Sequence, residues 1–208
     1  MRRVPVSTVR RLSLYLRLLE ECEREGKATV SSRALAERGD AAPAQVRKDL
    51  SFFGSFGQRG IGYPTALLAA RLRDILDLGR RHRVVLVGAG RIGAALANYP
   101  GFRARGFEVA AIYDSDPAKV GGSVDGVVVR DARDLEADLV QRPADIAVIG
   151  TPAGAAQGVA DRLVRSGVRA LLNFAPVTLV VPQSVAITNV NMALELEALC
   201  FALNQRRA

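Results

Sequence analysis

The chain has 208 residues, of which 49% are hydrophobic and 24% charged, and it carries a formal net charge of +8. This content is sufficient for one or two domains with apolar cores, and no apolar run reaches the ~20 residues that a membrane-spanning helix needs. The N-terminal residues lack the apolar core and cleavage site of a signal peptide, so we expect a cytoplasmic protein.

The cysteines and the histidine give no pattern typical of a metal site. Cys22 and Cys200 lie far apart in helix-like segments, which favours buried free thiols over a disulfide. His82 is the only histidine, so no Cys and His cluster has the spacing of metal ligands.

The positive charge is unevenly distributed. Residues 1–83 contain 17 Lys and Arg but 9 Asp and Glu, whereas residues 84–208 contain 12 of each kind. This asymmetry favours two modules, the first of which faces a polyanion such as nucleic acid. A coding bias toward arginine is the alternative, but it would not by itself favour the first 83 residues.

The first 51 residues predict three helices. A helix from Val6 has apolar residues at three- and four-residue steps and ends at Gly26. A short helix follows, capped by Ser31 or Ser32, and a third has Pro43 in its first turn. Two short helices joined by a tight polar turn match a helix-turn-helix.

The third helix has two different faces. Val46, Leu50 and Phe53 share an apolar face, whereas the opposite face presents four polar residues, Gln45, Arg47, Lys48 and Ser51. In a helix-turn-helix this polar face would lie in the DNA major groove. The alternative is a small helical cap whose basic residues are only solvated.

A glycine-rich stretch follows the third helix. Gly54, Gly57, Gly60 and Gly62 flank Arg59, which predicts a tight hairpin, the wing of a winged helix. An arginine at such a tip can enter the DNA minor groove, where negative potential is concentrated.

Residues 64–81 predict an amphipathic connecting helix, with an apolar stripe formed by Leu67, Leu68, Leu72, Ile75 and Leu76. We therefore expect a boundary near residue 80. The predicted domains are a winged-helix domain over 1–80, a nucleotide-binding domain over 81–190 and a C-terminal dimerisation helix over 191–208.

From residue 84 the pattern alternates between strands and helices. Strands are predicted over 84–88, 107–114, 126–129, 145–152 and 168–176, and helices over 91–99, 133–141 and 154–167. Apolar strands that alternate with helices are typical of a parallel sheet covered on both faces, an α/β fold.

A glycine turn follows the first of these strands. Gly88, Gly90 and Gly93 have the spacing of a dinucleotide-binding turn, and Asp114 lies 21 residues after Gly93 at the end of the next strand. A carboxylate there would accept hydrogen bonds from the adenosine ribose and repel a 2′-phosphate. The pattern favours NAD(H) over NADP(H), with another adenine nucleotide or a vestigial site as alternatives.

Groups for hydride-transfer chemistry are few in this module. It contains no histidine after His82, and its only lysine is Lys119. The fold uses nearly all residues to 190, which leaves no room for a substrate domain. We therefore expect a sensor rather than an enzyme. The alternatives are an NAD-dependent dehydrogenase with a basic appendage and a scaffold that recruits partners without binding DNA.

Residues 189–207 predict a helix that is apolar on more than one side. Met192, Leu196, Leu199 and Leu203 form one stripe, whereas Leu194 and Phe201 point elsewhere. Such a helix needs burial on several sides, either against a partner subunit or within its own domain.

The whole chain resembles the Rex family of bacterial redox-sensing transcriptional repressors. The resemblance is carried by residues 45–63 (QVRKDLSFFGSFGQRGIGY), 87–102 (VGAGRIGAALANYPGF) and 173–176 (NFAP). It implies a homodimer with a winged-helix domain, a Rossmann domain that binds NADH and a C-terminal helix swapped into the partner. It also implies binding to palindromic operators and release when NADH binds.

The resemblance also assigns residues. It places NAD(H) at Gly88, Ala89, Gly90, Arg91, Ile92, Gly93 and Asp114, with the nicotinamide end near Tyr99, Thr151 and Pro152. It places DNA contacts on Arg47, Lys48 and Arg59, and a redox-sensitive network on Arg17, Tyr99 and an aspartate that begins the swapped helix. This chain has Asn191 there, and an amide cannot form the charged pair with Arg17.

Overall fold

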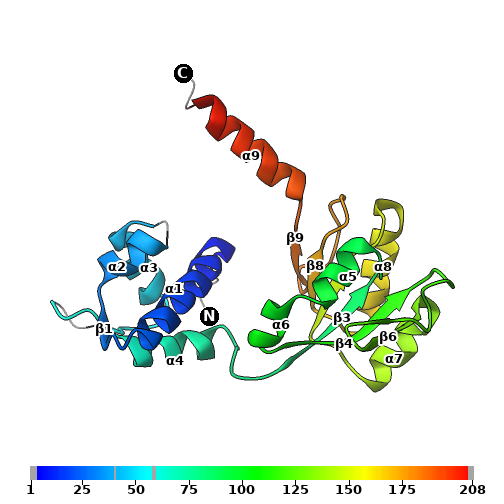
Figure 1. Ribbon diagram of the computed structural model, residues 1–208, viewed down its shortest axis with the longest axis horizontal. Coiled ribbons are helices and arrows are strands. Elements are labelled where there is room, and N and C mark those ends of the chain that lie inside the picture. The colour runs from blue at the N-terminus through cyan, green and yellow to red at the C-terminus, as the bar shows by residue number, and fades with distance from the viewer. Residues whose placement is uncertain (1–3, 40, 58–59, 206–208) are drawn as a thin grey trace. The chain divides into compact units, whose positions relative to one another are not determined.

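The computed structural model describes residues 4–39, 41–57 and 60–205. The chain separates into two compact units, Met1–Arg80 and Arg81–Ala208, which Figure 1 colours from blue to cyan and from green to red. None of the helices in this described part of the chain could cross a membrane.

The described part of the first unit contains four helices around one core. They are α1 (Val6–Arg24), α2 (Ser32–Arg38), α3 (Pro43–Ser51) and α4 (Thr65–Ile75). Ser31 caps α2, because its Oγ accepts a hydrogen bond from Ala34 N at 3.1 Å, and Pro43 begins α3. The three predicted helices are confirmed. Their shared core includes Leu12, Tyr15, Leu16, Leu19, Leu35, Val46, Leu50, Leu68 and Leu72.

The predicted helix over 64–81 was too long. The α4 helix ends at Ile75, and Asp77 then takes a left-handed conformation with φ of +53°. The Leu78 N–H donates to the Arg73 carbonyl at 2.9 Å, which closes the helix end. Leu67 of the predicted apolar stripe is 54% exposed, whereas Leu68 and Leu72 are buried.

The glycine-rich stretch after α3 is only partly a hairpin. Strand β2 (Tyr63–Pro64) pairs antiparallel with β1 (Thr29–Val30), which precedes α2, and residues 54–57 form no strand. Gly57 nevertheless lies against Tyr63, because a Cβ there would come within 2.7 Å of the tyrosine ring. The tip of the predicted wing, with Gln58 and Arg59, lies outside the described residues.

The second unit is built on a sheet with seven described strands in the order β5-β6-β4-β3-β7-β8-β9. All neighbours pair parallel except β5 with β6. The strands are β3 (His82–Val87), β4 (Phe107–Asp114), β5 (Ser123–Val124), β6 (Val127–Asp131), β7 (Ile146–Ile149), β8 (Ala170–Asn173) and β9 (Ala186–Asn189). The six parallel strands have the Rossmann order, so the predicted α/β class is confirmed.

Alternate residues of the central strand β3 point to opposite faces of this sheet. Val85 and Val87 join the core under α7 (Leu135–Gln141) and α8 (Ala153–Arg165). Val84 and Leu86 join a smaller core with Ala97 of α5 (Arg91–Ala97). A strand that is apolar at every position is therefore buried on both sides.

Three details differ from the predicted pattern. The helix over 91–99 ends at Ala97, because Pro100 begins α6 (Pro100–Ala104) and disfavours helical geometry at Tyr99. The helix over 133–141 begins with a 3-10 turn, η1 (Ala132–Asp134). Strands β5 and β9 were not predicted.

The C-terminal helix α9 (Met192–Gln205) forms as predicted, and none of its residues is buried in the single chain. Its apolar side chains, Met192, Leu194, Leu196, Leu199, Phe201 and Leu203, are 57–70% exposed. Cys200 is exposed with them, so the prediction of two buried thiols is wrong for Cys200 and correct for Cys22. The burial of Cys200 depended on a covering surface that the single chain does not supply.

Candidate nucleotide site and nucleic-acid interface

The glycine turn between β3 and α5 requires glycine for two different reasons. Gly88 has φ of +106°, a conformation that side chains with a Cβ rarely adopt. A Cβ at Gly93 would clash with the Gly88 carbonyl oxygen, so α5 approaches the strand too closely for any other residue. A Cβ at Gly90 would meet only open space, which leaves this part of the turn free for a ligand.

Asp114 ends β4 and holds the glycine turn in place. Its Oδ2 accepts a hydrogen bond from Ala89 N at 2.7 Å, and its Oδ1 accepts one from Asp116 N at 2.9 Å. Lys119 Nζ lies 3.1 Å from Oδ2. Burial alone would raise the pKa of Asp114, but these hydrogen bonds and the lysine charge hold it below its ordinary value. The carboxylate is therefore ionised at neutral pH.

A cavity of about 1140 Å³ opens at the carboxyl ends of the parallel strands. This edge of a doubly wound sheet, where the strand order reverses, is the usual place for a nucleotide. The cavity is lined by Val87, Gly88, Gly90, Arg91, Ile92, Asp114, Ser115, Asp116, Lys119, Ala132, Gly150, Thr151, Pro152, Ala155, Gly158, Val159, Asp161, Arg162, Arg165, Phe174 and Pro176. It is large enough for a dinucleotide-sized ligand.

Of the ten residues predicted to bind coenzyme, seven line this cavity: Gly88, Gly90, Arg91, Ile92, Asp114, Thr151 and Pro152. Gly93 and Ala89 lie behind it and shape the turn, through close packing and through the bond to Asp114. Tyr99 is not brought to the cavity; it is 54% exposed and packs edge-on against Phe102 with ring centres 5.3 Å apart.

Thr151 lines this cavity, and its buried hydroxyl has no hydrogen-bond partner. Among the described residues, only the hydroxyls of Thr65 and Thr151 are buried side-chain polar atoms without a hydrogen-bond partner. A buried polar atom without a partner is costly, so a ligand that supplies one would be stabilised at Thr151.

Asn173, at the end of β8, shapes the opposite wall. Its amide donates to the Val177 carbonyl at 2.8 Å and to Asn189 Oδ1 at 2.9 Å, and its Oδ1 accepts from Ala175 N at 3.0 Å. These bonds hold the turn that carries Phe174 and Pro176 into the cavity. From the sequence this stretch was recognisable only as a family motif, and Asn173 had no predicted role.

In the first unit, three of the four residues on the predicted polar face of α3 are exposed. Arg47, Lys48 and Ser51 are exposed, and Arg47 Nη1 donates to Ser32 Oγ at 3.0 Å. Arg47 and Ser51 line an open groove of about 700 Å³ between α3 and the glycine-rich stretch. The predicted DNA contact Arg59 lies outside the described residues.

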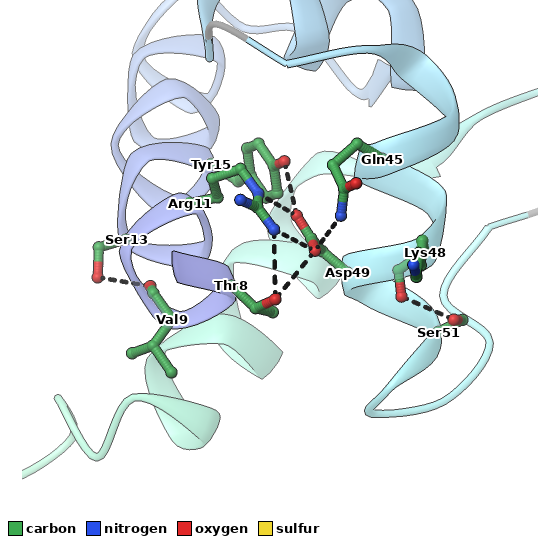
Figure 2. A network of polar contacts seen from close by, with 9 residues as sticks. All are labelled: Thr8, Val9, Arg11, Ser13, Tyr15, Gln45, Lys48, Asp49 and Ser51. Atoms are coloured by element: carbon green, nitrogen blue, oxygen red, sulfur yellow. Dashed lines mark hydrogen bonds and ion pairs between the residues drawn. The ribbon is translucent and has the colours of Figure 1, made fainter. Parts of the chain in front are cut away.

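Gln45 and Asp49 of α3 point toward α1 instead, as Figure 2 shows. Asp49 is fully buried and accepts hydrogen bonds from Thr8, Arg11, Tyr15 and Gln45. The Gln45 amide donates to Asp49 Oδ1 at 2.8 Å and is therefore half-buried rather than free on the outer face. This network was not predicted, although a carboxylate on the same helix face as Val46 and Phe53 was a signal for it.

Hydrogen bonding keeps the buried Asp49 charged. Burial would raise its pKa, but hydrogen bonds from Arg11, Gln45 and Tyr15 outweigh burial and hold the pKa below its ordinary value of 3.8. Burial, together with the bond to this carboxylate, raises the pKa of Tyr15 to about 12. The pair therefore joins α1 and α3 through an ionised carboxylate and a neutral phenol.

The predicted switch residues belong to different units. Arg17 is an exposed residue of α1 in the first unit, whereas Tyr99 and Asn191 are exposed in the second. Asn191 Oδ1 accepts a hydrogen bond from Ala193 N at 3.0 Å, so the side chain caps α9.

Comparisons with known proteins cover both units. Residues 3–51 match the family described as "Putative DNA-binding protein N-terminus", and residues 80–177 match the CoA binding domain family. The redox-sensing transcriptional repressor Rex of Desulfitobacterium hafniense is 45% identical over 99% of this chain and 98% of its own length. The chain belongs to the Rex family of redox-sensing transcriptional repressors.

Solved structures of a Rex-family repressor, RSP, agree with this assignment. RSP in complex with β-NAD⁺ and operator DNA is 36% identical, with a TM-score of 0.93 over 100% of this chain and 95% of that chain. RSP in complex with β-NADH is 34% identical, with a TM-score of 0.89 over 100% of this chain and 97% of that chain.

Membership of the Rex family decides between the functional alternatives. Rex proteins are transcriptional repressors, so the prediction of a regulator rather than an enzyme is confirmed, and the dehydrogenase alternative is set aside. The predicted combination of a helical DNA-binding region and a parallel Rossmann-like sheet is confirmed as well.

Proposed function

We propose that this Rex-family chain binds palindromic operator DNA through its first unit and releases it when NADH occupies the cavity of the second. The observation that carries the proposal is the glycine turn and Asp114 at the edge of the sheet, in one chain with an exposed basic face on α3. The complexes of RSP with NAD⁺, NADH and operator DNA support it.

The cavity residues fit a dinucleotide. The backbone around Gly90 and Arg91 would hold the pyrophosphate, and Asp114 would accept hydrogen bonds from the adenosine ribose. The unsatisfied Thr151 hydroxyl would bond the nicotinamide end beside Pro152. NAD⁺ and NADH differ in ring charge and planarity, so an apolar wall such as that of Phe174 would favour the uncharged ring.

DNA recognition would rest on α3 and the wing. With α3 in the major groove, Arg47, Lys48 and Ser51 would face the bases and phosphates. Arg59, which lies outside the described residues, would enter the minor groove from the predicted wing. Gln45 is also a candidate for a DNA contact. Because its amide donates to Asp49, however, its first role would be to position α3. The functional division is then a winged-helix domain over 1–80 and a Rossmann domain over 81–190.

We also propose a homodimer in which residues 191–208 pack on the partner. The sheet face over β3, β7, β8 and β9 carries an apolar groove of about 290 Å³, lined by Val84, Phe102, Phe107, Ile146, Val148, Ala170, Leu171, Leu172, Ala186 and Thr188. The exposed apolar residues of α9 are complementary to such a surface. Exchange of the helix between two copies would bury both.

The switch would involve Arg17, Tyr99 and Asn191. Because Asn191 is neutral and already caps α9, its pairing with Arg17 would be weaker than that of an aspartate. A hundredfold loss of operator affinity requires NADH to prefer the DNA-incompetent state by about 2.7 kcal/mol. Rotation of one subunit against the other would change the spacing of the two α3 helices from the ~34 Å of one DNA turn.

The test is operator binding across a series of NADH/NAD⁺ ratios at fixed salt, with the operator obtained by selection from random duplexes. NADH is expected to weaken binding much more than NAD⁺ does. Equal shifts by the two coenzymes would contradict a redox sensor. A selection that yields no preferred DNA sequence would contradict a repressor.

A further inference from the structure

A lysine lies directly beside the carboxylate that faces the adenosine end of the cavity. Lys119 Nζ is 3.1 Å from Asp114 Oδ2 and 3.6 Å from Asp116 Oδ2, and all three residues line the cavity. Nothing in the predicted coenzyme contacts assigned Lys119 a role. A lysine beside Asp114 is unexpected, because the carboxylate there is expected to exclude the negatively charged 2′-phosphate of NADP(H).

The donors around Asp114 are not equivalent. The Ala89 and Asp116 N–H groups are fixed by the backbone of the glycine turn and of the loop after β4. Lys119 instead reaches Asp114 through a flexible side chain that is 40% exposed. An incoming ribose hydroxyl therefore displaces Lys119 first, and the ammonium remains within reach of the ribose.

We propose that Asp114 and Lys119 act as one coenzyme-selecting pair. Lys119 is able to bind a 2′-phosphate, but the Asp114 carboxylate beside it prevents that binding in the native chain. This inference rests on the proposed binding of NAD(H) in the cavity. In the native chain the carboxylate accepts bonds from the ribose diol and repels a phosphate. Without its charge, the same place offers a phosphate an ammonium group and a freed Asp116 N–H.

Other groups at this end of the cavity modify the effect without reversing it. The Asp116 carboxylate opposes a phosphate, but it is 47% exposed, so solvent screens it. The Ser115 side chain belongs to the same wall and adds a hydroxyl donor. Arg162 faces the cavity from α8, where Glu136 already neutralises it.

The experiment compares the native chain with Asp114→Asn, Lys119→Met and the double variant, each titrated with NADH and NADPH by calorimetry. The amide in Asp114→Asn keeps an oxygen that can accept from the Ala89 N–H, but it carries no charge. We expect Asp114→Asn to raise NADPH affinity by about tenfold, and Lys119→Met to abolish that gain in the double variant. Equal NADPH affinity of Asp114→Asn and the double variant overturns the proposal.

Lys119→Glu provides a second measurement if Asp114→Asn fails to fold, because it leaves the bonds of Asp114 to the backbone in place. It should raise the ratio of NADH to NADPH affinity by about tenfold, and an unchanged ratio overturns the proposal. Arg103→Met is the matched control, since Arg103 is exposed and does not line the cavity. A native chain that binds neither coenzyme contradicts the proposed function itself, whereas NADH binding without any effect of Lys119 contradicts only this inference.

Discussion

Arg11 of α1 and Asp49 of α3 form a two-bond ion pair, with Nε to Oδ2 at 2.6 Å and Nη2 to Oδ1 at 2.8 Å. The two residues are 38 positions apart in the chain, and the Asp49 side chain is fully buried. Thr8 and Tyr15 of α1 also donate to Asp49, so these contacts set how α3 lies against α1 (Figure 2). The contacts of Asp49 on the inner face of α3 therefore fix the direction in which the outer face of this helix points.

Removal of the Asp49 carboxylate should destabilise the first unit strongly. In Asp49→Ala the half-buried Arg11 guanidinium and the Tyr15 hydroxyl lose their partner, so we expect a loss of about 3 kcal/mol in the free energy of unfolding. Urea unfolding followed by circular dichroism measures this loss. The exposed Lys27–Glu25 pair is the control: Glu25→Gln should cost less than about 0.5 kcal/mol. A similar small cost for Asp49→Ala would contradict the structural role of the network.

The contribution of Asp49 should depend on pH in one direction. Its folded-state pKa lies below 3.8, so the unfolded chain takes up a proton first as the pH falls. The stability that the carboxylate supplies is complete above about pH 5 and is lost as the pH falls through its folded-state pKa. The measurement is the difference in unfolding free energy between the native chain and Asp49→Asn from pH 7 to pH 3. That difference should stay constant to pH 5 and then shrink; growth on acidification would mean that the pKa is raised instead.

Substitutions on α3 should separate base contacts from phosphate contacts. We expect Arg47→Ala to lower operator affinity by about 1–3 kcal/mol, and Lys48→Ala to reduce the slope of affinity against salt concentration by about 1. Gel-shift titrations at several salt concentrations distinguish the two. Arg33→Ala, a charge removed from α2 on the same unit, serves as the comparison. If all three variants behaved alike, the effect would be one of net charge rather than of α3.

The glycine turn offers a test with a built-in control. Gly93→Ala places a Cβ against the Gly88 carbonyl oxygen, so we expect at least about a tenfold loss of NADH affinity. Gly154→Ala introduces the same methyl group into α8, where it meets only open space, and should leave NADH affinity unchanged. Coenzyme fluorescence titration reports both. Operator binding without coenzyme should survive in both variants, and its loss in Gly93→Ala would mean that the change unfolds the chain.

A charged residue on α9 should disrupt the proposed dimer. Leu199 is 60% exposed in the single chain, and Leu199→Asp would bring a carboxylate into the apolar interface. Light scattering should then give the 22.2 kDa of one chain, whereas the native protein should give twice that mass. Glu197→Gln on the same helix is the control. A dimer that tolerates Leu199→Asp would exclude α9 from the interface.

Most of the fold could be predicted from the spacing of residues that are close together in the chain. The apolar steps from Val9 to Leu19, the Pro43 helix start and the glycine turn at Gly88 act over a few residues, so they can be recognised without the tertiary structure. The end of α4 was missed because the left-handed Asp77 has no glycine to mark it. Strand β9 was missed because four residues at the edge of a sheet carry little periodicity.

The amino-acid sequence by itself determined the order of most helices and strands, the basic first module and the positions of the glycine turn and Asp114, because each depends on residues that are neighbours in the chain. Only the tertiary structure decided that Gln45 faces Asp49, that Lys119 pairs with Asp114, and that Tyr99 lies outside the cavity. The partners of a buried or half-buried polar group are set by how distant elements pack, and the spacing of residues along one element does not contain that information.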